Sequence, residues 1–283
     1  RSAIGEANLR AAQLPLVLVS PYEHHSNELS FREGLCDYLR VPLLSESGEI
    51  DLLALERILK LNAGRRIIGS FSAASNVTGV VSDYKKISEL IRAAGGIVAF
   101  DCAALSSHAN LDCDYFDAIF LSPHKLLGGP ASCGLLAIKK ELLNSDVPTF
   151  AAGGTVAYAS REGHVFLKNP EQLEEGGTPP IIGLMRANLA YALRNEVGFE
   201  QIKSIEDELA RLFESELAGI DEIINYAPKG APRLPIISFN VRGVSAYDFA
   251  ASLSNDFGIQ TRAGVMCAGP YAHDLLGIKE GRM

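Results

Sequence analysis

The sequence predicts an α/β fold with a mostly parallel sheet, and two observations support this prediction. First, residues 15–140 repeat one pattern, in which an aliphatic run ends in a polar cluster and a helix-like stretch follows. This alternation is typical of strands and helices that build a parallel sheet. Second, the run at 133–140 follows the run at 118–122 after only ten residues, which is too short for an ordinary parallel crossover. We therefore expect this last strand to run antiparallel.

Four apolar runs predict the parallel strands, namely PLVLVS at 15–20, RRIIGSF at 65–71, GIVAFD at 96–101 and AIFLS at 118–122. Between the second and third runs, Ser82 can cap a helix over residues 83–94, and Gly95 can end it. This helix would supply one crossover between parallel strands.

The C-terminal part of the chain predicts a second, smaller unit. Residues 180–194 and 200–219 have the apolar spacing of helices, and LPIISFNV at 234–241 has the composition of a strand. We place the boundary near Val197-Gly198, which gives a large domain at 1–197 and a small C-terminal domain at 198–283.

Composition narrows the class of protein. The net charge of −8 is spread along the chain with only short basic pairs, so we expect no nucleic-acid partner. No apolar run has the length of a membrane span, and the first fifteen residues lack the order of a signal peptide, so we expect a cytoplasmic protein without a membrane partner. The five cysteines lack C-x-x-C spacing, which favours free thiols and predicts no metal site.

The polar clusters at the strand ends predict one shared site, because ligands of open α/β sheets bind beyond the carboxyl ends of the strands. Four strand ends would contribute to this site. Their candidate residues are His24, His25, Ser75, Asn76, Asp101, Ser122, His124 and Lys125.

Lys125 is either an ordinary surface charge or a catalytic amine. It follows a predicted buried strand and precedes Gly128-Gly129, where backbone can approach a ligand closely. A desolvated lysine there could form a Schiff base, which needs an electron sink such as pyridoxal phosphate. Asp101 could hold the pyridine nitrogen of that cofactor protonated, although an aspartate in this position also commonly caps a turn.

The remaining candidates have equally plain alternatives. His24 and His25 could bind metal, stack on a planar cofactor or lie in the core, and their adjacent side chains disfavour a shared metal. In TRAGVMCAGP, Arg262 offers a bidentate group for a carboxylate and Cys267 a nucleophile. A surface arginine and a structural cysteine remain the simpler interpretation of the spacing.

Taken in order, EHHSN, SNVTG, D-x-A, SPHK, GGTP and RAGVMCAGP resemble the class V aminotransferase family of pyridoxal-phosphate enzymes. Within it they resemble the cysteine desulfurase and selenocysteine lyase branch. The resemblance covers about residues 15–270. It implies the fold type I architecture of pyridoxal-phosphate transferases and lyases, with the cofactor bound by the large domain.

The resemblance implies cofactor roles for five residues at matching positions. Lys125 would hold the cofactor as a Schiff base and move the α-proton of the substrate. Asp101 would pair with the pyridine nitrogen, and His24 would stack on the ring. Ser122 and His124 would bind the phosphate.

Four further roles concern the substrate and a second subunit. Asn76 would lie near the phenolic oxygen of the cofactor and the substrate, and Arg262 would bind the substrate carboxylate. Cys267 would take sulfur from the substrate and pass it to an acceptor protein. Thr178 would reach the phosphate in a neighbouring subunit, which implies a homodimer with shared sites.

Three departures from the family pattern accompany this resemblance. Ala104 stands where a glutamine usually contacts the phenolic oxygen, and Val265 and Met266 stand where the branch often has histidines. The phosphate-binding loop of the family is not recognisable in residues 1–13, which have the pattern of a helix. We expect that loop to precede Arg1, and we expect the small domain to be incomplete as well.

The sequence leaves three functions open. The first is a desulfurase or lyase that acts on a small amino acid at its β-carbon. The second is an aminotransferase, or a related lyase, that forms no persulfide. The third is a non-catalytic member that uses the fold as a binding protein or scaffold.

Overall fold

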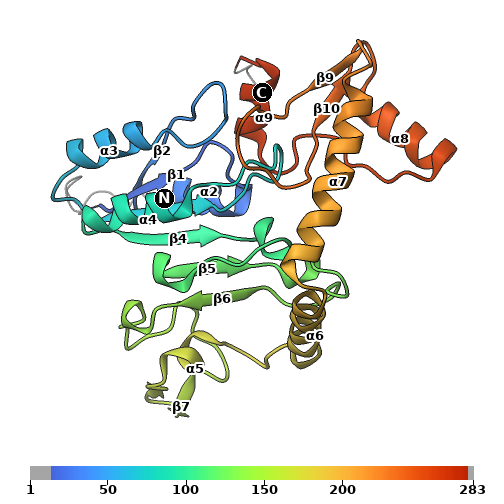
Figure 1. Cartoon of the computed structure of the whole chain (residues 1–283). Coiled ribbons are helices and arrows are strands. Elements are labelled where there is room, and N and C mark those ends of the chain that lie inside the picture. Colours follow the sequence, from blue (N-terminus) through green and yellow to red (C-terminus); the bar gives the residue numbers. More distant parts are fainter. Residues whose placement is uncertain (1–13, 280–283) are drawn as a thin grey trace.

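Six strands form the large sheet of residues 14–279, the part of the chain that the computed structural model describes. They are β1 (Leu16–Val19), β2 (Asp37–Arg40), β3 (Ile67–Ser72), β4 (Ile97–Asp101), β5 (Ala118–Leu121) and β6 (Leu135–Ile138). Their order is β2-β1-β3-β4-β5-β6, and the first five run parallel (Figure 1). Because β6 pairs antiparallel with β5, the predicted reversal of the last strand is confirmed.

The direction in which the chain progresses across the sheet reverses at β1. The chain goes from β1 outward to β2 and then returns to β3 on the other side of β1. A crevice opens beyond the carboxyl ends of parallel strands where such a reversal occurs, and ligands bind there. The sheet therefore places its natural ligand site beside the segments that follow β1 and β3.

Helices and short strands complete the described residues. The helices are α2 (His25–Arg32), α3 (Leu52–Leu61), α4 (Tyr84–Ala93), α5 (Pro170–Glu174), α6 (Ile181–Val197), α7 (Phe199–Leu217), α8 (Ala246–Phe257) and α9 (Gly269–Leu276). Short 3₁₀ helices are η2 (Leu105–Ser107), η3 (Cys113–Tyr115), η4 (Pro123–Lys125) and η5 (Lys140–Leu142). Two antiparallel pairs join β7 (Val156–Ala159) to β8 (His164–Phe166), and β9 (Ile223–Asn225) to β10 (Phe239–Val241).

The crossover helix α4 forms as predicted but has a different cap. The side chain of Asp83 accepts a hydrogen bond from the Lys86 amide, so Asp83 and not Ser82 is the N-cap. The hydroxyl of Ser82 is buried and donates to the Ser72 carbonyl instead. Gly95 follows the helix with a φ of 74°, as a glycine that ends a helix does. Buried Ile87 and Ile91 join the core.

The run at 234–241 is only partly a strand. Residues Phe239–Val241 form β10, whereas Leu234 donates its amide to the Gly79 carbonyl of the loop after β3. The first half of the run therefore ties the C-terminal part of the chain to the large sheet. The long helix α7 leads from the end of α6 towards β9 and β10 (Figure 1). The division at Val197-Gly198 stays a prediction.

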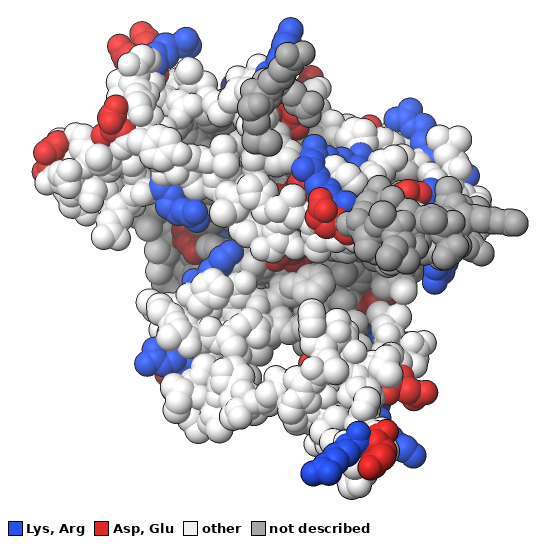
Figure 2. Space-filling view, turned by 180° about the vertical axis from the view of Figure 1, so that it is seen from behind, with Lys and Arg blue, Asp and Glu red and all other residues white. Residues whose placement is uncertain are grey.

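The surface carries charges in small groups of both signs. Figure 2 shows lysine and arginine interspersed with aspartate and glutamate on one face, with mostly uncharged surface between them. None of the helices within residues 14–279 is long and apolar enough to cross a membrane. The predicted helix in residues 1–13 lies outside the described residues.

Candidate active site

Residues at the carboxyl ends of four neighbouring strands line one cavity of about 590 Å³. It lies beyond β1, β3, β4 and β5, where the reversal of the sheet predicts a ligand site. The predicted site residues that line it are His24, Asn76, Asp101, Ser122, His124 and Lys125. The structure thus brings together six residues that the sequence spreads over a hundred positions. Ser75 is not among them, because its hydroxyl accepts the amides of its own turn.

A second cavity of about 490 Å³ adjoins the first and shares His24, Asn76 and Lys125 with it. Arg262 lines this second cavity, together with apolar side chains of β10, α8 and α9. The predicted substrate arginine therefore lies on the same side of the site as the predicted lysine. Within residues 14–279, Thr178 and Cys267 line neither cavity, although Met266 does. Both Thr178 and Cys267 are exposed.

A hydrogen bond from the backbone to the His24 ring sets the tautomer of its neutral form. Its Nδ1 accepts the Ser26 amide at 3.1 Å as the N-cap of α2, so the proton of the neutral ring lies on Nε2. Partial burial lowers the pKa of His24, and although Asp101 opposes this, the positive charges of Lys125 and Arg262 lower it further. A neutral imidazole at pH 7 suits stacking on a planar ring better than a charged one beside two cations.

The Asp101 carboxylate serves a local turn and remains open to a ligand. Its Oδ1 accepts the Ala103 amide at 2.8 Å, which is the turn-capping role expected of many aspartates. Among residues 14–279 no lysine, arginine or histidine forms an ion pair with it. Asp101 is half-buried and lines the larger cavity. A cationic group of a ligand could therefore form an ion pair with its carboxylate.

Lys125 is presented by a tight turn and is not desolvated. It ends the 3₁₀ helix η4, where its amide donates to the Ser122 carbonyl at 3.0 Å, and its side chain is exposed. The structure thus shows an accessible amine at this position, and the catalytic role of Lys125 stays a prediction. Exposure leaves the amine free to reach either cavity, both of which it lines.

The glycine pair after Lys125 serves the chain's own packing. A Cβ placed on Gly129 would lie 1.9 Å from the Pro123 carbonyl oxygen, because the chain folds back on η4 at this point. Gly128 has a φ of 79°, in the region that favours glycine. Gly129 therefore lies where backbone packs closely on backbone, and a close approach of this segment to a ligand stays a prediction.

We expect Gly129→Ala to lower the free energy of unfolding by about 3 kcal/mol, because the methyl group must displace the turn that carries Lys125. Chemical denaturation of the variant measures this change. Gly134→Ala is the matched control, since its Cβ would meet its nearest neighbour, the Leu121 carbonyl oxygen, at 3.7 Å and its φ is not positive. Equal stability of the two variants would contradict the packing argument.

Glu23 is a residue of this region that sequence reasoning missed. It is 1% exposed, and its carboxylate accepts five hydrogen bonds, from the amides of Ser20 and Ser72, their hydroxyls and the Asn27 side chain. Burial raises the pKa of Glu23, while these donated hydrogen bonds oppose the rise. Because the donors come from the residue after β1, from α2 and from β3, the carboxylate fixes the segment that carries His24 to the sheet. A glutamate in the short segment after a buried strand, four residues beyond Val19, was the available signal.

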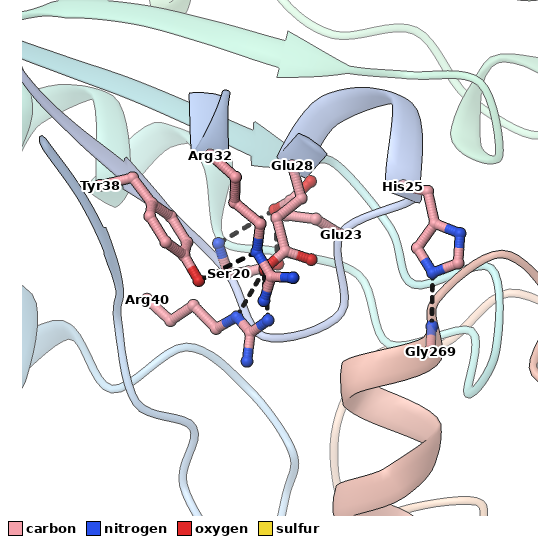
Figure 3. A network of polar contacts seen from close by, with 8 residues as sticks. All are labelled: Ser20, Glu23, His25, Glu28, Arg32, Tyr38, Arg40 and Gly269. Carbon is pink, nitrogen blue, oxygen red and sulfur yellow. Dashed lines mark hydrogen bonds and ion pairs between the residues drawn. The ribbon is translucent and has the colours of Figure 1, made fainter. Parts of the chain in front are cut away.

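Helix α2 is also fastened to the edge strand β2. The buried Glu28 carboxylate forms ion pairs with Arg32 on its own helix, at 3.3 Å, and with Arg40 on β2 (Figure 3). The same view shows the ring of His25 turned away from this cluster and towards Gly269 at the start of α9. The start of α2 is therefore held from several sides.

The class of protein follows from this arrangement and from a direct comparison. The aminotransferase class-V family matches residues 9–281, nearly the whole chain, and the chain belongs to this family. Its members depend on pyridoxal phosphate. The parallel sheet with one reversed strand agrees with the predicted fold class.

Individual relatives are named as cysteine desulfurases. The chain is 32% identical over 276 residues to a cysteine desulfurase of Salmonella agona, which covers 94% of this chain and 64% of the relative. It is 28% identical over 280 residues to a probable cysteine desulfurase of Halalkalibacterium halodurans, which covers 95% of this chain and 65% of the relative. The chain thus spans about 65% of the length of these curated relatives.

Solved structures agree with these sequence matches. The cysteine desulfurase CsdA of Escherichia coli superposes with a TM-score of 0.83 at 26% identity, covering 97% of this chain and 67% of that one. The cysteine desulfurase of Thermococcus onnurineus has a TM-score of 0.80 at 25% identity, covering 94% and 66%. The predicted fold and family are therefore confirmed.

The residues of the larger cavity fit the cofactor of the family. Beside the Asp101 carboxylate, the side-chain oxygen of Asn76 is buried and has no hydrogen-bond partner within residues 14–279. A buried polar atom without a partner is costly, so a ligand group that donates to it would stabilise the site. A neutral histidine, an open carboxylate and an accessible amine at one cavity form a set that suits a pyridoxal ring.

Proposed function

We propose that this chain carries the active site of a pyridoxal-phosphate enzyme of the cysteine desulfurase type. The observation that supports this most is the gathering of His24, Asn76, Asp101 and Lys125 around one cavity at adjacent strand ends. The cysteine desulfurase relatives support the reaction type. Because the chain spans about 65% of their length, the activity of the whole protein is part of the proposal.

Each residue has a task that its position suits. Pyridoxal phosphate, when bound, supplies an electron sink that stabilises negative charge at the α-carbon of the substrate. The exposed Lys125 amine holds the cofactor and then takes the α-proton. Asp101 keeps the pyridine nitrogen protonated, and neutral His24 lies against the ring. Ser122 and His124 bind the phosphate.

Arg262 and Cys267 act on the substrate. The guanidinium of Arg262 binds the substrate carboxylate in the second cavity, near Lys125. The Cys267 thiolate attacks the sulfur of L-cysteine, so an S–S bond forms as the bond between sulfur and the β-carbon breaks. The electron pair of the broken bond stays with the β-carbon, which takes up a proton and is thereby reduced to the methyl group of alanine, while the sulfur is oxidised to the outer sulfur of a persulfide. The reaction balances without an outside oxidant.

An exposed Cys267 also suits delivery of the sulfur. The persulfide can be reached by the thiol of an acceptor protein, because the cysteine lies on a turn at the surface. The free state of Cys36, Cys102, Cys113, Cys133 and Cys267 supports a reducing compartment such as the cytoplasm.

We include a homodimer with shared sites in this proposal. Helix α6 exposes large apolar side chains at every fourth position, and Met185 and Leu189 are 58% and 66% exposed. This stripe begins three residues after Thr178, the residue expected to reach the partner's phosphate. Its other face already packs in the monomer through buried Ala187 and Ala190. We propose that a second copy of the chain covers this stripe, because that arrangement would place Thr178 at the phosphate site of the partner subunit.

Leu189→Asp is expected to shift the full-length protein from dimer to monomer, because a charge in an apolar interface loses its hydration. Analytical ultracentrifugation measures the change. Asn188→Asp adds the same charge at a neighbouring exposed position and should leave the dimer intact. A wild-type protein that sediments as a monomer contradicts the shared-site proposal.

The function itself is tested with the full-length protein and pyridoxal phosphate. We expect an absorbance band near the visible edge, a borohydride-stable label on Lys125, and equal amounts of alanine and sulfide from L-cysteine with a reductant. A protein that takes up no label overturns the proposal. Conversion of an amino acid and a keto acid without sulfide would instead identify an aminotransferase.

A further inference from the structure

The turn that carries Cys267 has an unusual backbone. Met266 and Cys267 have φ values of 52° and 56°, and the Ala268 amide donates to the Val265 carbonyl at 2.9 Å. Residues with side chains are strained in this left-handed conformation, which glycine adopts freely. The turn therefore needs contacts from elsewhere in the molecule to hold it.

Three hydrogen bonds link this turn and the start of α9 to the segments that follow β1 and β3. The Asn76 side chain donates to the Met266 carbonyl at 2.7 Å, and the His25 amide donates to the Cys267 carbonyl at 2.7 Å. The Gly269 amide donates to His25 Nε2 at 2.9 Å (Figure 3). The carbonyls of both left-handed residues are thus fixed, as is the residue where the chain enters α9.

His25 acts here as a cap from a distant element. The N-cap position of α9 is Ala268, which has no side chain that can accept a hydrogen bond. The first amide of the helix is satisfied by the imidazole of His25 instead, 244 residues away in sequence. Because Nε2 accepts, the neutral ring carries its proton on Nδ1. His25 thus contacts the chain at Cys267 through its backbone amide and two residues later, at Gly269, through its side chain.

We propose that His25 is a positioning residue that holds the Cys267 turn in its left-handed conformation and so fixes the thiol for sulfur transfer. The proposal rests on the proposed desulfurase function. It assigns to the second histidine of EHHSN a task separate from that of His24, which faces the cofactor cavity. Neither metal binding nor stacking is needed to explain His25.

The test compares His25→Ala with His25→Gln in the full-length protein loaded with pyridoxal phosphate. Glutamine can place an acceptor where Nε2 lies, whereas alanine cannot. In His25→Ala we expect hydrogen exchange of peptides that contain Gly269 to rise about tenfold, because one hydrogen bond at a helix start is lost. We expect persulfide formation on Cys267, followed by mass spectrometry, to fall about tenfold. His25→Gln should restore both, and His273→Ala on α9 should change neither.

A second measurement separates positioning from general damage. Exchange of the α-proton of L-alanine in D₂O depends on Lys125 and the cofactor and does not need a thiol, so it should change less than about twofold in His25→Ala. Unchanged hydrogen exchange at Gly269, or an equal loss of α-proton exchange and persulfide formation, overturns the role of His25. A wild-type protein without α-proton exchange instead overturns the proposed function, while the hydrogen-exchange comparison still decides whether His25 holds the turn.

Discussion

Lys125→Ala in the full-length protein is expected to abolish sulfide release from L-cysteine, with a loss of at least about 10³-fold. The side chain is the one lysine amine that lines both cavities, so within residues 14–279 no other lysine can replace it in holding the cofactor or in moving the α-proton. The α-proton exchange of L-alanine should disappear together with sulfide release. Steady-state kinetics and proton NMR in D₂O measure the two losses.

Two companion variants make the Lys125 result specific. Lys125→Arg keeps the positive charge but offers no nucleophilic amine, so it should be as inactive as the alanine variant. Lys140→Ala removes an exposed lysine of η5 outside both cavities and should retain full activity. If Lys125→Arg remains active, the lysine contributes charge alone and the proposed chemistry is wrong.

Cys267→Ser is the change with the second largest expected effect. Sulfide release from L-cysteine should fall by at least about 10²-fold, because a hydroxyl is a far weaker nucleophile toward sulfur than a thiolate. The α-proton exchange of L-alanine should persist, since Lys125 and the cavity that it lines are unchanged. This split between two readouts separates the sulfur-transfer step from cofactor chemistry.

The control for this variant is another exposed thiol. Cys113 lies in η3 and is also exposed and free, yet it lines neither cavity. Cys113→Ser should therefore keep full sulfide release. Wild-type sulfide release in Cys267→Ser would remove the persulfide from the mechanism and favour a lyase that frees sulfide directly.

The large sheet and the gathering of its strand ends follow from local patterns. All residues of β1 are buried, which is why its sequence LVLV is apolar and could be recognised. The polar residue after it marked the carboxyl end of the strand, where ligands of such sheets bind. Edge strand β2 was missed because its sequence DYLR is mostly polar, as edge strands commonly are. Asp83 rather than Ser82 caps α4, because the Ser82 hydroxyl is buried and donates to the Ser72 carbonyl. The residues next to Ser82 in the sequence do not indicate this contact.

The arrangement around Cys267 could not be predicted. Positive φ angles usually leave a glycine or asparagine in the sequence, and here Met266 and Cys267 adopt them. The partners of this turn, His25 and Asn76, are about two hundred residues away, and only tertiary structure brings them close. Gly129 differs in that its partner Pro123 is only six residues away, yet the tight turn that leaves no room for a side chain at Gly129 was not recognised from the sequence.

The left-handed turn at Met266 and Cys267 also bears on how this protein can change by mutation. Glycine at position 266 would relieve strain and raise stability, yet it would let the thiol sample many orientations. Selection for stability and selection for catalysis therefore favour different residues at this position. If methionine is retained at position 266, a fixed orientation of the Cys267 thiol matters more to the protein than the stability that glycine would add.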